Sequence, residues 1–151
     1  MSPSSPQGLC LGGLELIERV IDSSTLAKFL LRESGWERVK GILTGKPYTL
    51  DLAVKEVANA IWRRVTLMGD VSLEKALVIL GDLLELRRVA LRVEPQDPYL
   101  GQALRIAIEN RVTVYDSLFI AQALAKKAAL TTSDERQGRV AERLNLEVEY
   151  I

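Results

Sequence analysis

The segment LELIERVIDSSTLAKFLL (residues 14–31) decides the fold. Its first part, LELIERVI (14–21), is short and β-branched near its end, which is typical of a strand. Asp22 and three hydroxyl residues follow at once, and such a cluster favours capping of a helix, here over residues 25–34. The pattern predicts a strand that leads directly into a helix, with a carboxylate at the junction.

The same alternation of strand and helix continues along the chain. Segment 111–115 fits either a short strand or an irregular connection. Because strands separated by helices are typical of a parallel sheet covered on both faces, we predict an α/β domain. We expect helices over 36–43, 51–68, 73–88, 99–110, 116–127 and 133–144, and further strands over 48–50, 89–95, 128–132 and 146–151.

The bulk composition limits the class of protein. The chain has 151 residues, 48% of them hydrophobic and 26% charged, which suits one compact domain and excludes a disordered chain. We expect one domain over 14–151 and no membrane association, because the chain has no apolar run of membrane length. The segment 1–13 is rich in Ser, Pro and Gly and predicts a flexible extension. It has no basic residue of the kind that opens a secretory signal, and the single cysteine suits a reducing compartment, so we expect a cytoplasmic protein.

Four acidic residues lie in or beside separate hydrophobic segments: Asp22, Glu56, Asp116 and Asp134. Parallel sheets place their ligands at the carboxyl ends of the strands, so Asp22 and Asp134, which follow predicted strands, are candidates for one site. Each also has a plainer interpretation. Asp22, Asp116 and Asp134 precede predicted helices, which a carboxylate can cap.

Glu56 lies in the middle of a helical pattern with apolar neighbours, which predicts partial burial. A buried carboxylate without a partner is costly. A metal ion would remove that cost; so would pairing with Arg63 or Arg64, or exposure at the edge of the apolar stripe.

The chain contains no histidine, which excludes a metal-free ribonuclease with paired imidazoles and a Ser-His-Asp hydrolase. It also lacks the glycine-rich loop of P-loop nucleotide-binding proteins. Four carboxylates suit hard divalent cations, Mg²⁺ or Mn²⁺, and such ions support phosphodiester hydrolysis. Because twenty basic residues balance twenty acidic ones, a polyanionic substrate must be held locally or through metal.

Four segments carry a family resemblance in the same order: VIDSSTLAKFLL, EVANAI, YDSLFIAQALA and LTTSDERQ. They resemble the motifs of the PIN-domain family, and specifically its VapC-like branch of toxin ribonucleases, from about Leu14 to Ile151. The resemblance implies a three-layer α/β/α sandwich with a central parallel sheet of about five strands. It also implies an acidic metal pocket and Mg²⁺-dependent or Mn²⁺-dependent cleavage of RNA. The long segment before Asp22 departs from the usual family start.

Carried over by position, the family's acidic residues are Asp22, Glu56, Asp116 and Asp134. Thr132 matches its usual hydroxyl residue, and Asn59 matches a frequent polar position. Two further inferences concern residues near these motifs. Ser23 and Thr132 are candidates for orienting the carboxylates. Substrate phosphates could be held by Lys28, Arg63 and Arg136, among other nearby basic residues (Lys55 and Arg64).

Two kinds of partner are expected besides RNA. A leucine stripe over 73–84, together with LFIAQALA (118–125), predicts more apolar helical surface than one small sheet needs, which favours a homodimer. The resemblance further implies a small antitoxin protein.

Trp62 is expected in the core. The alternatives are a non-catalytic PIN-like scaffold, or a PIN nuclease that acts on ribosomal-RNA precursors or structured DNA.

Overall fold

The computed structural model describes residues 10–11, 14–15 and 17–151. A five-stranded sheet forms its centre, with the strand order β5-β4-β3-β6-β7 and every neighbouring pair parallel. The strands are β3 (Arg19–Ile21), β4 (Tyr48–Leu50), β5 (Arg92–Glu94), β6 (Ala129–Thr132) and β7 (Val148–Tyr150). Residues 111–113 form an irregular connection.

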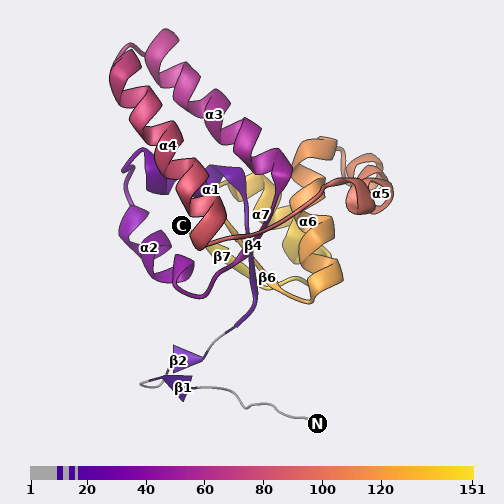
Figure 1. Cartoon of the computed structure of the whole chain (residues 1–151). Helices are drawn as coiled ribbons and strands as arrows, with labels where there is room; N and C mark the ends of the chain where they lie inside the picture. The colour runs from indigo at the N-terminus through magenta and orange to yellow at the C-terminus, as the bar shows by residue number, and fades with distance from the viewer. Residues whose placement is uncertain (1–9, 12–13, 16) are drawn as a thin grey trace.

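Helices cover both faces of this sheet. Helices α1 to α4 lie on one side, and α5 to α7 lie on the other (Figure 1). This arrangement confirms the predicted three-layer α/β/α sandwich with a parallel sheet. The helices are α1 (Ser23–Leu30), α2 (Trp36–Leu43), α3 (Asp51–Thr66), α4 (Leu73–Val89), α5 (Leu100–Asn110), α6 (Val114–Lys126) and α7 (Glu135–Arg143), with a 3-10 turn η1 (Asp97–Tyr99) before α5.

The expected extension over residues 1–13 falls largely outside the described residues. Of that segment only β1 (Cys10–Leu11) is described, and it pairs antiparallel with β2 (Leu14–Glu15). No helix in the described part of the chain is both long and apolar enough to cross a membrane.

Helix α6 is the central helix of the core. Every residue from Ser117 to Ala123 is buried, including Phe119 and Ile120. The sheet lies against one side of this helix, and α5 packs closely on another. LFIAQALA therefore supplies mainly core packing, with only Ala125 exposed, contrary to its part in the homodimer argument.

The long helices α3 and α4 form an antiparallel hairpin that projects beyond the sheet (Figure 1). Leu73 and Leu77 of the predicted leucine stripe are about 60% exposed on it, whereas Leu80 packs against the core. Trp62 is 49% exposed on α3, so its expected place in the core is wrong. Trp62 lies on the solvent-facing side of α3, whereas Ile61 and Val65, one turn apart, pack against the core.

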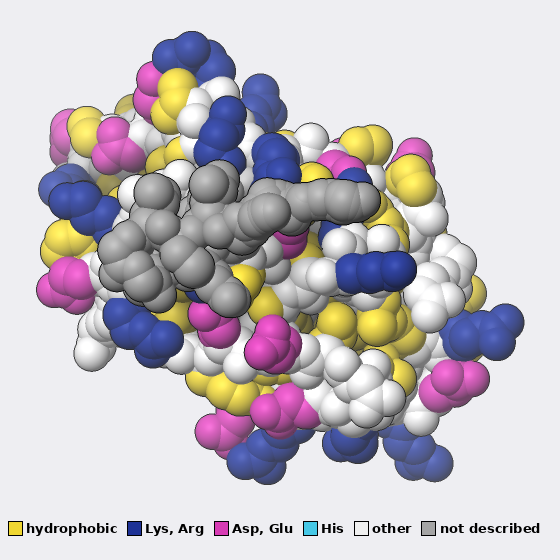
Figure 2. Space-filling view, turned by 90° about the horizontal axis from the view of Figure 1, so that it is seen from below, with side chains coloured by type: hydrophobic (Ala, Val, Ile, Leu, Met, Phe, Trp, Pro, Cys, Tyr) yellow, Lys and Arg dark blue, Asp and Glu magenta, His cyan; other side chains and the backbone are white. Residues whose placement is uncertain are grey.

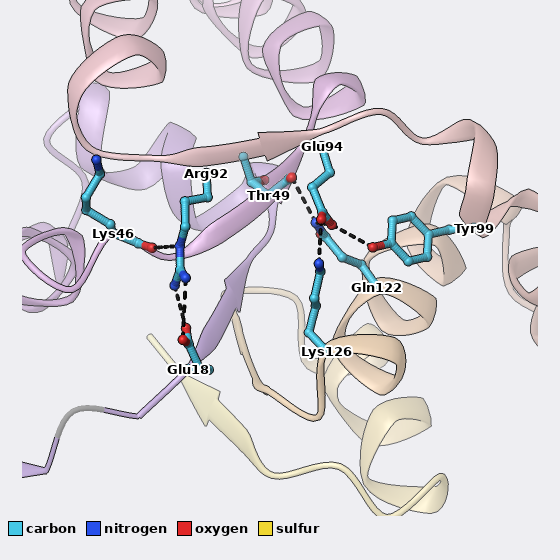
Figure 3. A network of polar contacts seen from close by, with 8 residues as sticks. All are labelled: Glu18, Lys46, Thr49, Arg92, Glu94, Tyr99, Gln122 and Lys126. Atoms are coloured by element: carbon cyan, nitrogen blue, oxygen red, sulfur yellow. Dashed lines mark hydrogen bonds and ion pairs between the residues drawn. The ribbon is translucent and has the colours of Figure 1, made fainter. Parts of the chain in front are cut away.

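A polar network fixes the edge strand β5 to its neighbours (Figure 3). The carboxylate of Glu94 accepts hydrogen bonds from Tyr99 Oη at 2.6 Å and Gln122 Nε2 at 3.0 Å, and it pairs with Lys126 Nζ at 2.5 Å. The same Gln122 nitrogen donates to the Thr49 carbonyl oxygen at 2.9 Å. Burial alone would raise the pKa of Glu94, but these partners outweigh it and lower the pKa. The network joins β5, β4 and α6.

The surface charge agrees with a neutral chain. Figure 2 views the end of the molecule from which β1 and β2 extend, and outside the residues drawn in grey it shows basic and acidic side chains interspersed. Any strong local charge that serves a polyanion must therefore be sought in particular hollows.

Candidate active site at the carboxyl edge of the sheet

Asp22 follows β3 directly and caps helix α1. Its Oδ1 accepts hydrogen bonds from the Thr25 amide at 3.0 Å, the Thr25 hydroxyl at 2.8 Å and the Ser24 hydroxyl at 2.9 Å. Its Oδ2 accepts a bond from the Thr132 hydroxyl at 2.5 Å. The side chain is almost fully buried, and this burial raises the pKa of Asp22 although the hydrogen bonds act to lower it. A carboxylate is thus held in the interior by hydroxyl and amide donors.

Thr132 connects this carboxylate to the next strand end. It is the last residue of β6, and its hydroxyl also accepts a hydrogen bond from the Asp134 amide at 2.9 Å. Asp134 caps helix α7, because its Oδ1 accepts hydrogen bonds from the Arg136 and Gln137 amides at 3.0 and 3.2 Å. The ends of β3 and β6 are therefore joined through one buried hydroxyl.

Glu56 reaches the same edge from the second turn of α3. Its Oε1 accepts a short hydrogen bond from the Ser23 hydroxyl, so the first turn of α1 holds the carboxylate in place. Burial raises the pKa of Glu56, the Ser23 bond opposes this, and the negative charges of Asp116 and Asp22 raise it further. No basic side chain of the described residues forms an ion pair with Glu56, so the expected alternative of an arginine partner is not realised.

Asp116 lies in the first turn of α6 and does not cap it. The helix begins two residues earlier than expected, at Val114, and Thr113 is its cap: the Asp116 amide donates to the Thr113 hydroxyl at 3.1 Å. The carboxylate is free of a capping role in this structure. Burial raises the pKa of Asp116, the charge of Asp134 raises it further, and Thr113 and Arg136 act to lower it.

The four acidic residues therefore converge from α1, α3, α6 and α7 on one edge. Another acidic residue at this edge provides a contrast: Asp51 follows β4 but is exposed, and its Oδ1 accepts a hydrogen bond from the Gln96 amide at 3.0 Å. Position after a strand is thus not enough to place an acidic residue in the cluster.

A hollow of about 740 Å³ opens beside this cluster, between α1 and α3. Glu56 and Ser23 line it, and so does Ser24, which holds Asp22. Tyr115, the neighbour of Asp116, lines it with 61% of its surface exposed. The acidic cluster can therefore be reached from solvent through this hollow.

Lys28 and Arg63, which were expected to hold substrate phosphates, line the hollow, and so does Asn59. Lys28 donates to the Ser34 carbonyl oxygen at 3.1 Å, and Arg63 is exposed. Arg64 also lines the hollow but is occupied by Asp70 and Glu33 at 2.8 and 3.2 Å. Arg136 lies elsewhere, in a second hollow beside Asp134.

The sequence did not identify three residues that belong to the site: Ser24, Thr25 and Gln137. The run of three hydroxyl residues after Asp22 was the available signal for the first two, because every one of them donates to a site carboxylate. Gln137 is buried, and its Nε2 donates to the Asp116 carbonyl oxygen at 2.8 Å, which ties α7 to the first turn of α6. No spacing in the sequence predicts that contact.

The donor chemistry of the site fits a hard divalent cation. It offers carboxylate and hydroxyl oxygens, and the buried Ser133 hydroxyl beside Ser24 has no partner within the described structure. As the side chains lie, no three acidic or cysteine groups among residues 10–11, 14–15 and 17–151 are close enough to enclose an ion. Both oxygens of Asp22 and one of Glu56 are taken by hydroxyl donors instead.

Known proteins share this sequence and architecture. A family model described as PIN domain matches residues 19–143. Ribonuclease VapC3 of Pyrobaculum aerophilum is 31% identical over 119 residues, which cover 78% of this chain and 89% of that protein. The crystal structure of PAE2754 from the same organism covers 93% of this chain and 94% of its own, at 25% identity and a TM-score of 0.64. VapBC2 from Rickettsia felis, bound to a DNA fragment from its promoter, shares the fold at 13% identity and a TM-score of 0.61, with 89% of this chain and 99% of that one covered.

Proposed function

Because the chain belongs to the PIN domain family, we propose that it is a divalent-metal-dependent endoribonuclease and the toxin of a VapBC-type toxin–antitoxin pair. One observation carries the proposal: the carboxylates are brought so close that the charges of Asp116 and Asp22 raise the pKa of Glu56, and the charge of Asp134 raises the pKa of Asp116. Such an arrangement costs stability in the absence of a cation and is typical of a functional site. The ribonuclease named among the relatives supports RNA as the substrate.

Asp22, Glu56, Asp116 and Asp134 would hold Mg²⁺ or Mn²⁺. The ion would supply electrostatic stabilisation of the charge that develops on the phosphate and would lower the pKa of a water molecule. Asp116 and Glu56 are half-buried, and Ser23 donates one hydrogen bond to Glu56, whereas Asp22 is fixed by four hydrogen bonds.

The remaining residues would position the carboxylates and the substrate. Ser23 and Thr132 orient Glu56 and Asp22 by direct hydrogen bonds. Lys28, Asn59 and Arg63, which line the hollow, would contact the RNA. Their place around the acidic residues lets cationic side chains hold phosphates on the approach to the metal.

Cleavage of a labelled pool of single-stranded RNAs tests the activity. The chain is incubated with Mg²⁺, with Mn²⁺ and with EDTA, next to Asp116→Asn and the matched control Asp51→Asn, which changes an exposed aspartate at the same edge. We expect cleavage with either ion, none with EDTA, loss of cleavage in Asp116→Asn and normal cleavage in Asp51→Asn. Metal should also raise the Tm of the parent chain more than that of Asp116→Asn.

Cleavage that persists in EDTA would refute the metal mechanism. Absence of cleavage together with equal Tm values in Mn²⁺ and EDTA would favour a non-catalytic scaffold. Cleavage limited to ribosomal-RNA precursors or structured DNA, added as further substrates, would keep the enzyme and change its target.

We also propose a small antitoxin protein and a second copy of this chain as partners, with the protein acting in the cytoplasm. The two protein partners are supported by the exposed apolar surface on the α3–α4 hairpin. This surface includes Trp62, Met68, Leu73 and Leu77, each at least 49% exposed. Sedimentation of the purified chain at micromolar concentration, alone and after co-expression with a small neighbouring reading frame, tests both partners. A monomer in both samples would contradict them.

A further inference from the structure

A second hollow, of about 580 Å³, lies on the other side of the acidic residues. One wall is helix α7, which carries Arg136, Arg139 and Arg143 at positions i, i+3 and i+7, and this spacing places all three on one face. The opposite wall is the connection between α5 and α6, including Arg111. We call this hollow the arginine groove. Its arginine face extends about 10 Å along α7, from the rise of 1.5 Å per residue.

The arginine groove holds more positive than negative charge. Four arginines line it, against the two acidic residues Asp134 and Glu135. Arg139 pairs with Glu135 at 2.6 Å on the exposed face of the helix. Arg111, Arg136 and Arg143 form no ion pair within the described part of the chain. This concentration is notable in a chain with a net charge of zero.

The arginine groove is continuous with the acidic site. Asp134 lines it, and the charge of Arg136 acts on the pKa of Asp116. One nitrogen of the Arg136 guanidinium donates to the Arg111 carbonyl oxygen at 3.2 Å, which fixes the side chain across the groove. The acidic residues therefore lie between two hollows lined by basic groups, with Lys28 and Arg63 in the first.

We propose that the arginine groove binds the phosphates of the RNA strand on one side of the cleaved bond, through Arg136 and Arg143. The inference rests on the proposed function, because it takes RNA as the substrate. Guanidinium groups bind phosphate oxygens in a bidentate manner, and exposed arginines without acidic partners keep their donors free for this. The first hollow would then hold the strand on the other side of the cleaved bond.

Binding of a labelled single-stranded RNA to the Asp116→Asn chain, followed by fluorescence anisotropy over a range of salt concentrations, tests the groove. In this background Arg136→Gln and Arg143→Gln are combined. The matched control combines Arg87→Gln and Arg105→Gln, which remove two exposed arginine charges from α4 and α5 outside both hollows. Two lost phosphate contacts should reduce the slope of log K against log salt by about 1.4, at about 0.7 for each contact. The control should keep the parent slope.

A second measurement separates this inference from the proposed function. In the active chain, the double variant should raise KM for a long RNA much more than KM for a dinucleotide, because a dinucleotide is too short to extend along the groove. If the parent cleaves RNA with metal while the double variant keeps the parent's slope and KM, the groove proposal is wrong and the nuclease stands. If no RNA is cleaved but the slope still falls, the groove stands and the nuclease is wrong. An equal fall in the control would also overturn the groove, because it would show a non-specific charge effect.

Discussion

Replacement of Thr132 by valine tests how the buried carboxylate of Asp22 is held. Valine has nearly the shape of threonine and lacks the hydroxyl that donates to Asp22 Oδ2 at 2.5 Å. Both residues are buried, with 0% and 2% of their surfaces exposed, so water cannot easily replace the lost donor. A hydrogen bond to a charged group contributes about 1.5–3 kcal/mol. In a chain of this size, about 2 kcal/mol corresponds to a fall in Tm of about 4–8 °C.

Thr49→Val is the matched control. Thr49 is equally buried, and its hydroxyl donates to the Ile21 carbonyl oxygen at 2.7 Å, a neutral acceptor. A neutral hydrogen bond contributes about 1 kcal/mol, so this control should lower Tm by about 2–4 °C. The difference between the two variants contains the effect of the charge on Asp22 and the loss of the hydroxyl that accepts from the Asp134 amide at 2.9 Å, and only the first of these depends on the ionisation of Asp22.

The dependence on pH provides the stricter test. Burial leaves the folded pKa of Asp22 above its usual value, and the Thr132 bond acts to lower it, so Thr132→Val should raise this pKa further. The loss of stability should therefore be fully present above the folded pKa of the variant. It should shrink as pH falls from that value to the folded pKa of the parent, because a protonated Asp22 needs the donor less. Urea unfolding of both variants and the parent in EDTA, over a series of pH values, measures these losses. A loss for Thr132→Val that equals that of Thr49→Val at every pH would refute the reasoning.

Three further predictions concern other charges of the molecule. Asp116→Asn should lower the pKa of Glu56 and raise Tm in EDTA by about 2–4 °C, the effect of about 1 kcal/mol, because one of the like charges is removed. Carboxyl titration by NMR measures the pKa, and a melting curve measures Tm. An unchanged pKa of Glu56 would contradict the like-charge argument. Lys126→Met should destabilise the fold at neutral pH and much less in acid. The lowered pKa of Glu94 gives stability that is present above the unfolded pKa of Glu94 and is lost as pH falls through its folded pKa. An equal loss of stability at both pH values in urea unfolding would argue against this. Asp134→Asn should keep the stability of the parent within a few tenths of a kcal/mol, whereas Asp134→Ala should lose about 1 kcal/mol, because asparagine caps helices as well as aspartate does. If Asp134→Asn also keeps full cleavage, the charge of Asp134 has no part in the reaction.

Local signals in the sequence explain why the fold could be predicted. Asp22 and Ser72 mark the beginnings of α1 and α4 as side-chain caps, and the structure shows both bonds. Apolar alternation between strands and helices predicted the layers, because each strand of the parallel sheet except the last, β7, is followed by at least one helix long enough to cover it. These features depend on neighbours within a few residues.

The errors concern surroundings that local spacing does not encode. The start of α6 was placed at Asp116 because aspartate is a good cap, but Thr113 takes that role three residues earlier. LFIAQALA was expected to contribute surface, although the sheet and α5 bury it on different sides. Trp62 was expected in the core, yet it lies on the exposed side of α3, and its neighbour Ile61 takes the core-facing position. In each case the tertiary environment determines the outcome.

The sequence offers capping and catalysis as alternative explanations for the acidic residues. The geometry shows that one carboxylate can serve both roles. Asp134 uses Oδ1 for both of its capping bonds. Asp22 likewise caps α1 through Oδ1, while its Oδ2 faces Thr132. A cap fixes a carboxylate at a helix start, and helices that follow parallel strands all start at the same edge of the sheet. The capping bonds therefore bring these two carboxylates to the site and still leave an oxygen on each that does not take part in capping, so evidence for a cap at Asp22 or Asp134 does not count against a role in catalysis.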